Sequence, residues 1–423
     1  MNLDWTRLRA VVLESDDWGL CAWSPDSQAW RALADQPPFR TPSGKRYAGS
    51  TLESAEDVKA ISDTLIEFRG GDGFPPVWQA NTVMSSPDYA RLEPPGFAVE
   101  HLPLLDFPNV PSRWQRPRLW EQVSIARMAG LWWPELHGLH HLPEHTWLTA
   151  LRRGENDARR AHEHQSPVCS AVEASGEYAA TEPEAVRARN LELAVTKFRS
   201  LFGRLPGSVC PPDYRWDDRL ESDAERLGIP TIQGKPEQLG HALPRLRRIL
   251  LTFQWPHTRG PHFYLPPRIA FEPAAQPRNA AKVGAEAAAR AVKRAWQRGQ
   301  PAIVSTHRMN YVHLDHAHAE EGRTALRELL VKLEREGAVF LTDREVYELQ
   351  TRRWSVREIG ARGVLVRYYG VPREPIRFGA PSGVTGVSLR EGRRDEGADL
   401  ALANGEVEAR LNDGEYLIEW QRE

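Results

Sequence analysis

Three groups of chemically active side chains each follow a short apolar run in this sequence. The groups are Asp16 with Asp17 after residues 10–13, His137 with His141 after residues 131–136, and His307 after residues 302–304. Adjacent acids behind a buried run repel each other and resist ionisation unless they have partners. A metal ion would bind one of the two acids and leave the other as a base. A helix N-cap beside a surface acid is the plainer alternative.

The histidines extend this interpretation. His137 and His141 are four residues apart, which brings two imidazoles to one metal ion if the segment turns helically. With 14 histidines in the chain, a surface or core cluster is the alternative. His307 is either a general acid or a structural histidine. One Asp and two His match the three protein ligands of a catalytic zinc-type site, and such a site suits hydrolysis of an amide or ester.

A parallel α/β scaffold is predicted to position these side chains. Buried strands are expected at residues 10–13, 76–80, 131–136, 208–210, 229–232, 302–304 and 338–341. Helices that each stop at a glycine are expected at residues 51–69, 184–202, 217–227, 280–298 and 320–336. Their alternation indicates a barrel or an open sheet, and a barrel gathers functional side chains at the carboxyl ends of its strands. Proline-rich connections interrupt the pattern at residues 86–117 and 230–275.

The pattern changes after about residue 354. Short alternating strands are expected at residues 364–369, 384–390, 400–403 and 416–420, with hairpin turns at Asn404-Gly405 and Asp413-Gly414. We therefore expect a barrel domain at residues 1–350 and a small antiparallel β domain at residues 355–423. The small domain binds carbohydrate, mediates dimerisation or shields the barrel, and the sequence leaves these alternatives open.

Composition excludes several classes of protein. The chain has 423 residues, a net charge of −2 and 41% hydrophobic residues, which argues against disorder and against electrostatic capture of nucleic acid. Three scattered cysteines do not form a disulfide framework. The sequence shows no signal peptide and no apolar membrane span, so we expect a cytoplasmic protein. The 15 tryptophans indicate either core packing or flat faces for sugar rings.

Together, these motifs resemble the polysaccharide deacetylase superfamily of NodB-homology proteins, whose fold is a deformed (β/α) barrel. In that family an Asp-Asp pair follows the first strand, a His-x-x-x-His motif follows a later one, and a terminal strand ends in a catalytic His. The matching segments here are Ser15–Gly19, His137–His141 and Ser305–His307. Glu14–Gly19, Phe271–Pro273 and Ser305–Tyr311 resemble a bacterial branch of the superfamily.

The resemblance implies a role for each matching residue. It makes Asp16 the general base and His307 the general acid. It also makes Asp17, His137 and His141 the ligands of a divalent metal ion, which is expected to be Zn²⁺. The Arg-x-Pro-Tyr segment of the family corresponds to residues 210–214 here. The backbone N–H of Tyr214 is therefore expected to help hold the oxyanion.

Two positions depart from the family pattern. Cys210 stands where the family has the arginine that pairs with the catalytic base, and Arg215 or Arg308 is the candidate replacement. Gly138 stands where the family has Ser or Thr after the first His. The acid that orients the catalytic His in the family has no assigned counterpart. The candidates for contacting substrate are Trp18, which could stack on a sugar, and Arg215, Arg308 and Asn310.

The expected function is metal-dependent removal of acetyl groups, N-acetyl in preference to O-acetyl, from a sugar, polysaccharide or glycoconjugate. The expected partner is this acetylated carbohydrate, and no nucleic acid is expected. The sequence does not decide between a monomer and a homo-oligomer. One alternative is a glycoside hydrolase, which needs two separated carboxylates. Asp16 and Asp17 are adjacent, however, and no second acid stands out at another strand end. The other alternative is a glycan-binding protein on a degenerate barrel, motivated by the lost arginine.

Overall fold

The computed structural model describes residues 3–172, 176–234, 255–259, 262–274, 281–392 and 398–422. Part of the proline-rich connection expected at residues 230–275 lies outside these ranges. So does the first residue of the helix expected at residues 280–298.

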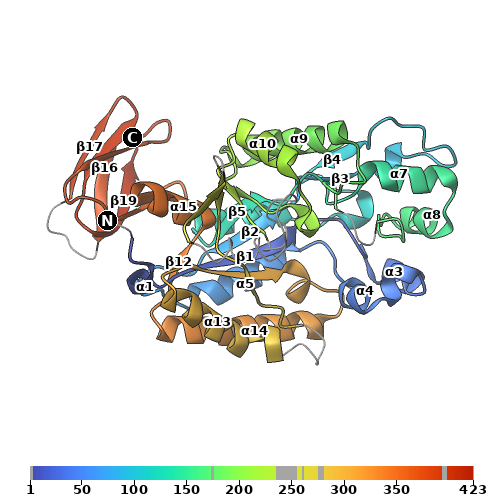
Figure 1. The fold of residues 1–423 in the computed structure, drawn as a ribbon, viewed down its shortest axis with the longest axis horizontal. Coiled ribbons are helices and arrows are strands. Elements are labelled where there is room, and N and C mark those ends of the chain that lie inside the picture. The colour runs from blue at the N-terminus through green and yellow to red at the C-terminus, as the bar shows by residue number, and fades with distance from the viewer. Residues whose placement is uncertain are drawn as a thin grey trace.

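A curled ten-stranded sheet forms the centre of the molecule (Figure 1). Its order is β10 (Ile269–Ala270), β11 (Ala302–His307), β1 (Ala10–Trp18), β2 (Trp78–Thr82), β5 (Trp132–Leu136), β6 (Ser208–Val209), β7 (Thr231–Ile232), β9 (His262–Tyr264) and β8 (His257–Arg259), with β12 (Val339–Leu341) beside β1. All pairings are parallel except that of β8 with β9. Within the described ranges nothing pairs β8 with β10, so the barrel is deformed, as the sequence predicts.

All seven strands predicted for this region are present. Strand β1 is buried along its whole length because strands flank it and helices cover the sheet (Figure 1). The strands that sequence analysis missed are β8, β9 and β10, together with the antiparallel pair β3 (Ser85–Pro87) and β4 (Leu104–Asp106). Each of these has two or three residues, which is too short to show a periodic pattern.

The five predicted helices are also present, within a few residues at their ends. They are α5 (Ala55–Ile66), α9 (Glu184–Phe202), α10 (Asp218–Arg226), α13 (Ala285–Gln297) and α14 (His316–Arg335). In Figure 1, α9 and α10 lie on one side of the sheet, and α13 and α14 on the other. The described ranges also contain α1 (Trp5–Leu8), α2 (Ser27–Leu33), α3 (Pro37–Arg40), α4 (Pro42–Tyr47), α6 (Leu119–Met128), α7 (Glu144–Arg153), α8 (Asn156–Glu163) and α15 (Asp343–Arg352). Among the described helices, none has the length and apolarity needed to cross a membrane.

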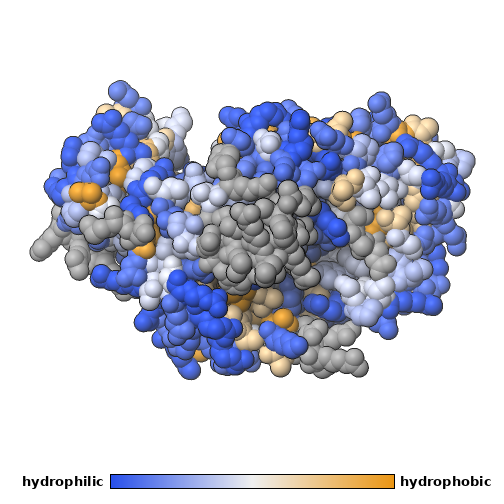
Figure 2. Space-filling view, in the orientation of Figure 1, coloured by the Kyte–Doolittle hydropathy of each residue, from blue (hydrophilic) through white to orange (hydrophobic). Residues whose placement is uncertain are grey.

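Tryptophans fill much of the core between the sheet and the helices that cover it. The ring of Trp18 is 1% exposed and meets Trp132 edge to face, with ring centroids 4.6 Å apart. A second edge-to-face contact joins Trp18 to Trp78. The surplus of tryptophan therefore serves mainly core packing. On the face shown in Figure 2, the described side chains at the surface are largely hydrophilic.

The C-terminal strands form two antiparallel sheets of their own. One has the order β13 (Trp354–Ile359), β14 (Gly363–Tyr368), β19 (Gly414–Gln421), β16 (Gly386–Gly392), and the other has the order β15 (Pro375–Gly379), β18 (Glu406–Arg410), β17 (Asp399–Ala403). Asn404 and Gly405 have φ of 52° and 75° and join β17 to β18, as their sequence predicts. The hairpin predicted at Asp413-Gly414 is wrong, because β18 and β19 belong to different sheets.

A buried arginine ties these sheets to the barrel. Arg367 of β14 is fully buried, and its guanidinium lies 2.6 Å from Asp72 and also contacts Glu345 of α15. Arg357 of β13 lies 3.4 Å from the same Glu345 carboxylate. Both acids are buried, so each needs the cation to offset its loss of hydration.

We expect Arg367→Met to lower the free energy of unfolding by about 3–5 kcal/mol, because it leaves two buried acids without their shared partner. Urea denaturation measures the loss. Arg377→Met is the matched control: Arg377 pairs with Glu408 at the surface, where ion pairs contribute at most about 1 kcal/mol. Equal losses in the two variants would contradict the special role of Arg367.

Candidate active site

The candidate residues meet in one cavity of about 470 Å³ at the carboxyl ends of β1, β5 and β11. Six of those predicted from sequence line it: Asp16, Asp17, His137, His141, Tyr214 and His307. The cavity is also lined by Arg268 and Glu272, which sequence analysis did not assign. Its size is that of a site for a small ligand.

A bulge in β1 allows two adjacent acids to line the same cavity. Neighbouring residues of a regular strand point to opposite faces. The register of β1 against β2 shifts between Ser15 and Trp18, and Asp17 has a φ of 75°. A bulge of this kind re-aims a side chain and stores backbone strain, which is common beside active sites.

Three side chains converge as metal ligands would. The Nε2 atoms of His137 and His141 lie 3.3 Å and 3.7 Å from Oδ1 of Asp17. One ligand atom from each of the three residues lies within 4.8 Å of the others. The segment from His137 to His141 is not helical, contrary to the condition set from sequence; Gly138 and His141, with φ of 95° and 57°, bend it instead.

The donor set fits a divalent ion such as Zn²⁺. One carboxylate and two imidazoles are ligands that Zn²⁺ commonly takes at catalytic sites. His137 Nδ1 lies 2.8 Å from the carbonyl oxygen of Cys210, which fixes the ring and leaves Nε2 facing Asp17. Cys210 also lies close enough to Asp16 and His137 to be a metal ligand. Its thiol is less suited to bind the ion, because burial raises its pKa and a thiol binds metal as the thiolate.

The partner of the candidate base is Arg268. Its two terminal nitrogens each donate to one oxygen of Asp16, at 2.9 Å, and Asn81 adds a third bond at 2.6 Å. Burial opposes ionisation of Asp16, but the charges of Arg268 and His137 hold its pKa well below the ordinary range. A bidentate arginine of this kind is among the strongest charge-assisted contacts.

This finding corrects the two arginines suggested from sequence. Arg308 is 1% exposed and donates to Glu53 and to the Leu20 carbonyl, at 2.8 Å and 2.9 Å. Arg215 does not line the cavity as described. Arg268 precedes β10, which pairs with the last part of β11 and therefore begins near the cavity. A two-residue strand in a proline-rich stretch gave no signal in the sequence.

A second acid lies behind Arg268. Glu14 is fully buried, and its Oε2 is 2.5 Å from Nε of Arg268. Burial and the nearby charge of Asp343 outweigh Arg268 and raise the pKa of Glu14 well above its ordinary value. Burial also raises the pKa of Asp343, to about 6. The two acids that share Arg268 therefore differ: the pKa of Glu14 is raised, whereas that of Asp16 is held low.

The candidate acid also has a carboxylate partner. His307 Nδ1 lies 2.5 Å from Oε1 of Glu272, and Asn310 donates to Oε2 of the same carboxylate at 2.7 Å. Burial opposes ionisation of the His307 imidazole, but Glu272, Asp16 and Asp17 outweigh it and raise its pKa to about 9. Glu272 is thus the orienting acid that had no counterpart in the sequence, although its Phe271–Pro273 segment carried part of the family resemblance.

Two further candidates lie away from the cavity, and the N–H of a third, Tyr214, is already bonded. Asn310 is fully buried and holds Glu272 instead of lining the cavity. Trp18 is in the core, so it presents no ring face to a sugar; Trp23 and Tyr47 line the cavity instead. The backbone N–H of Tyr214 donates to the Pro211 carbonyl at 2.9 Å, which takes it away from an oxyanion.

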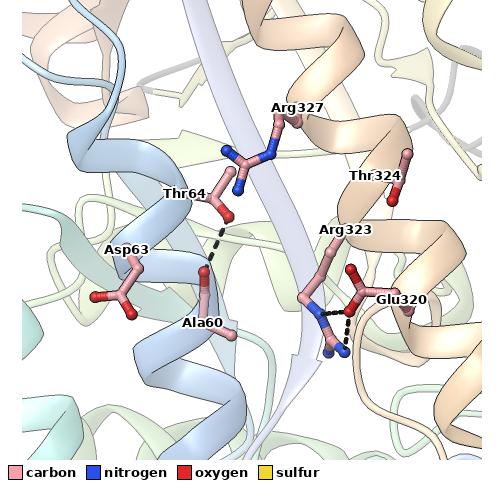
Figure 3. Close-up of a pocket in the computed structure, with 7 residues that line it drawn as sticks. All are labelled: Ala60, Asp63, Thr64, Glu320, Arg323, Thr324 and Arg327. Carbon is pink, nitrogen blue, oxygen red and sulfur yellow. Dashed lines mark hydrogen bonds and ion pairs between the residues drawn. The ribbon is translucent and has the colours of Figure 1, made fainter.

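A further hollow, of about 250 Å³, lies between α5 and α14 (Figure 3). Its arginines are paired with acids: Arg323 lies 2.8 Å from Glu320, and Arg327 contacts Glu67. None of the candidate site residues lines it. The hollow is therefore separate from the site described above.

Comparison with known proteins gives distant structural similarity. No protein-family model matches the chain, and no curated protein is significantly similar in sequence. The chain is similar to solved carbohydrate deacetylases. A protein assigned as a polysaccharide deacetylase from Mycobacterium smegmatis has 12% identity and a TM-score of 0.42, covering 81% of this chain and 90% of that one.

Two other solved structures are similar to the same degree. The carbohydrate deacetylase Agd3 has 10% identity and a TM-score of 0.44, covering 96% of this chain and 64% of that one. A 4-alpha-glucanotransferase from Thermococcus litoralis has 10% identity and a TM-score of 0.42, covering 81% and 40%. Function therefore has to be inferred from the side chains of the site itself.

The raised pKa of Glu14 predicts a pH dependence of stability. Burial makes its carboxyl group hold the proton to higher pH in the folded chain than in the unfolded chain, which ionises it above its ordinary pKa. Stability from this group is therefore present at low pH and is lost as pH rises. We expect Glu14→Gln, which keeps the neutral shape, to gain stability relative to the parent protein between about pH 5 and about pH 8.

Urea denaturation at the two pH values measures this difference. Exposed Glu286→Gln is the control, because its carboxylate already pairs with Lys332 at the surface and gives no such rise. A Glu14→Gln variant that loses stability relative to the parent as pH rises would show that Glu14 is ionised in the folded protein.

Proposed function

We propose that this chain is a metal-dependent hydrolase that removes acetyl groups from a carbohydrate, N-acetyl in preference to O-acetyl. One observation carries the proposal: the three possible metal ligands converge in a cavity that also contains a base and an acid, each held by its own partner. Asp17, His137 and His141 would hold the ion. A bound divalent ion would polarise the acetyl carbonyl and acidify a water molecule.

The proton transfers belong to two side chains of neighbouring strands. In the parallel pairing of β1 with β11, Asp16 lies opposite His307, and Oδ2 of Asp16 is 3.8 Å from Nε2 of His307. Asp16, ionised, takes a proton from the attacking water. His307 gives its Nε2 proton to the leaving nitrogen as the C–N bond breaks, so acetate and a free amine are formed.

The walls of the cavity support an uncharged substrate. Away from the ionisable groups, they are formed by aliphatic and aromatic side chains, which are Leu20, Ala22, Trp23, Tyr47, Leu142, Pro167, Val168, Val172 and Pro211. An acetyl methyl group and the apolar face of a sugar ring both suit such walls. An amine leaves only when it is protonated, which suits an acid whose pKa is raised to about 9.

The contacts also weigh against the two alternatives. The alternative of a non-catalytic glycan-binding protein was motivated by a missing arginine. Arg268 makes the contact to Asp16 that this arginine would make. A glycoside hydrolase needs two carboxyl groups for acid and nucleophile or base. Asp16 could supply one of them, but Glu272 is bound to His307 and Asn310, and Asp17 faces two imidazoles.

We expect the purified protein to bind a divalent metal and to release acetate from at least one member of a panel of N-acetylated sugars and oligosaccharides. Asp16→Asn should lower this release by about 10²- to 10⁴-fold while the metal stays bound, since it removes the base alone. His137→Ala should lose both the bound metal ion and the release of acetate. Metal analysis and an acetate assay measure these effects.

The control for these variants is His313→Ala, because His313 stacks on His318 and does not line the cavity. It should keep metal and activity. Acetate release that persists in Asp16→Asn would contradict the proposed base, and sugar release without acetate would favour a glycoside hydrolase.

The Glu272–His307 contact predicts the alkaline limb of the pH profile. A general acid works only while protonated, so activity falls as pH rises through its pKa. Glu272→Gln removes the charge that raises the pKa of His307 to about 9. We therefore expect the alkaline fall in kcat/KM to move to lower pH, measured as acetate release between about pH 6 and about pH 10. An unchanged profile would show that His307 is not the acid.

A further inference from the structure

The segment that carries His137 and His141 has no regular secondary structure to hold it. It follows β5 directly and takes left-handed backbone at Gly138 and His141, with φ of 95° and 57°. Such a conformation at a non-glycine residue costs free energy and persists only where the surroundings fix it. Two imidazoles on this segment can meet one ion only if its backbone is fixed.

A buried carboxylate holds this backbone. Glu177 accepts a hydrogen bond from the N–H of Leu139 at 2.7 Å, from that of His140 at 2.8 Å and from that of His141 at 3.0 Å. The side chain of Glu177 is 0% exposed, so these bonds lie in a medium of low dielectric. Successive N–H groups around one carboxylate form an anion-binding concavity in the chain.

The third histidine of the segment reinforces this arrangement. The ring of His140 is buried away from the cavity, with Nδ1 3.2 Å from Oε2 of Glu177 and Nε2 3.6 Å from Glu144 of α7. Asn190 of α9 lies 3.3 Å from the same Nε2. His140 thus connects the segment to two helices, while its neighbour His141 faces Asp17.

Glycine at position 138 fits the same carboxylate. A Cβ atom built there would lie 2.2 Å from Oε1 of Glu177, and the φ of 95° already disfavours any side chain. The carboxylate therefore occupies the space that a residue such as Ser or Thr would need. The departure of Gly138 from the family pattern and the presence of Glu177 are two parts of one arrangement.

We propose that Glu177 is the positioning residue of the metal site: it fixes the backbone from Leu139 to His141 so that both imidazoles point at Asp17. Glu177 does not line the cavity, so it acts through the loop rather than on substrate or ion. The inference rests on the proposed function, because it presupposes that Asp17, His137 and His141 bind a metal ion.

The test measures metal affinity in the metal-free full-length protein. Zn²⁺ is titrated against a chromophoric chelator, and Co²⁺ absorption reports the geometry of the ligands. Glu177→Gln replaces one acceptor oxygen by an NH₂ group that opposes the backbone N–H groups. We expect Zn²⁺ to bind about 10- to 100-fold more weakly, the usual effect of losing a residue that orients ligands, and the Co²⁺ spectrum to change.

Glu182→Gln is the matched control. Glu182 is also buried and accepts from two backbone N–H groups, those of His145 and Thr146 at 2.7 Å and 3.1 Å, but it serves the start of α7. It should lower stability without changing Zn²⁺ affinity. If Glu177→Gln does not fold, Glu177→Asp withdraws the carboxylate by one methylene and should also weaken Zn²⁺ binding.

The outcomes separate this inference from the proposed function. If the parent protein binds Zn²⁺ no better than His137→Ala, the metal site itself is wrong. If the parent binds Zn²⁺ and the folded Glu177 variant binds it equally well with the same Co²⁺ spectrum, the role of Glu177 is overturned while the metal site stands. Equal weakening in the Glu177 and Glu182 variants would also overturn it, since the effect would then be general destabilisation.

Discussion

The arrangement of the site depends on the guanidinium group of Arg268, which contacts two buried acids. Its terminal nitrogens bind both oxygens of Asp16, and its Nε faces Glu14. Both acids belong to β1, which is buried along its length in the centre of the sheet. Without Arg268, two buried carboxyl groups would lose the cation that they share, and ionised Asp16 would be strongly disfavoured.

Each buried acid of the site is stabilised by a different device. Asp16 is bound by a guanidinium, Glu14 has a raised pKa that favours its neutral form, and Glu177 is surrounded by backbone N–H groups. Asp17 has two imidazoles on one oxygen, at 3.3 Å and 3.7 Å. Among these four acids, only Asp17 places a carboxylate oxygen beside two imidazole nitrogens in the cavity, which is a donor set that suits a metal ion.

The sequence predicted the parts of the site that depend on local pattern. Asp16, His137 and His307 end strands whose apolar runs are visible within a few residues, so their position at one edge of the sheet follows from the α/β pattern. No local pattern marks Arg268 or Glu177, because their partners are distant in the sequence. Arg268 binds Asp16, 252 positions away, and Glu177 binds Leu139, 38 positions away. Trp18 was misplaced for the opposite reason: proximity in sequence to Asp17 does not place its ring in the cavity, since the backbone turns between them.

Asp16 and His307, the proposed base and the proposed acid, also depend on each other. Their strands are parallel neighbours with Asp16 opposite His307, so the register of β1 and β11 sets the 3.8 Å between the carboxylate and the imidazole. At that distance a proton could pass from imidazolium to carboxylate and leave both groups neutral. Arg268 opposes this transfer by stabilising the charge of Asp16, and Glu272 opposes it by stabilising the charge of His307. The two outer partners therefore keep the pair charge-separated at neutral pH, with the proposed base free of a proton and the proposed acid holding one, which is the state from which the proposed hydrolysis of an amide would start.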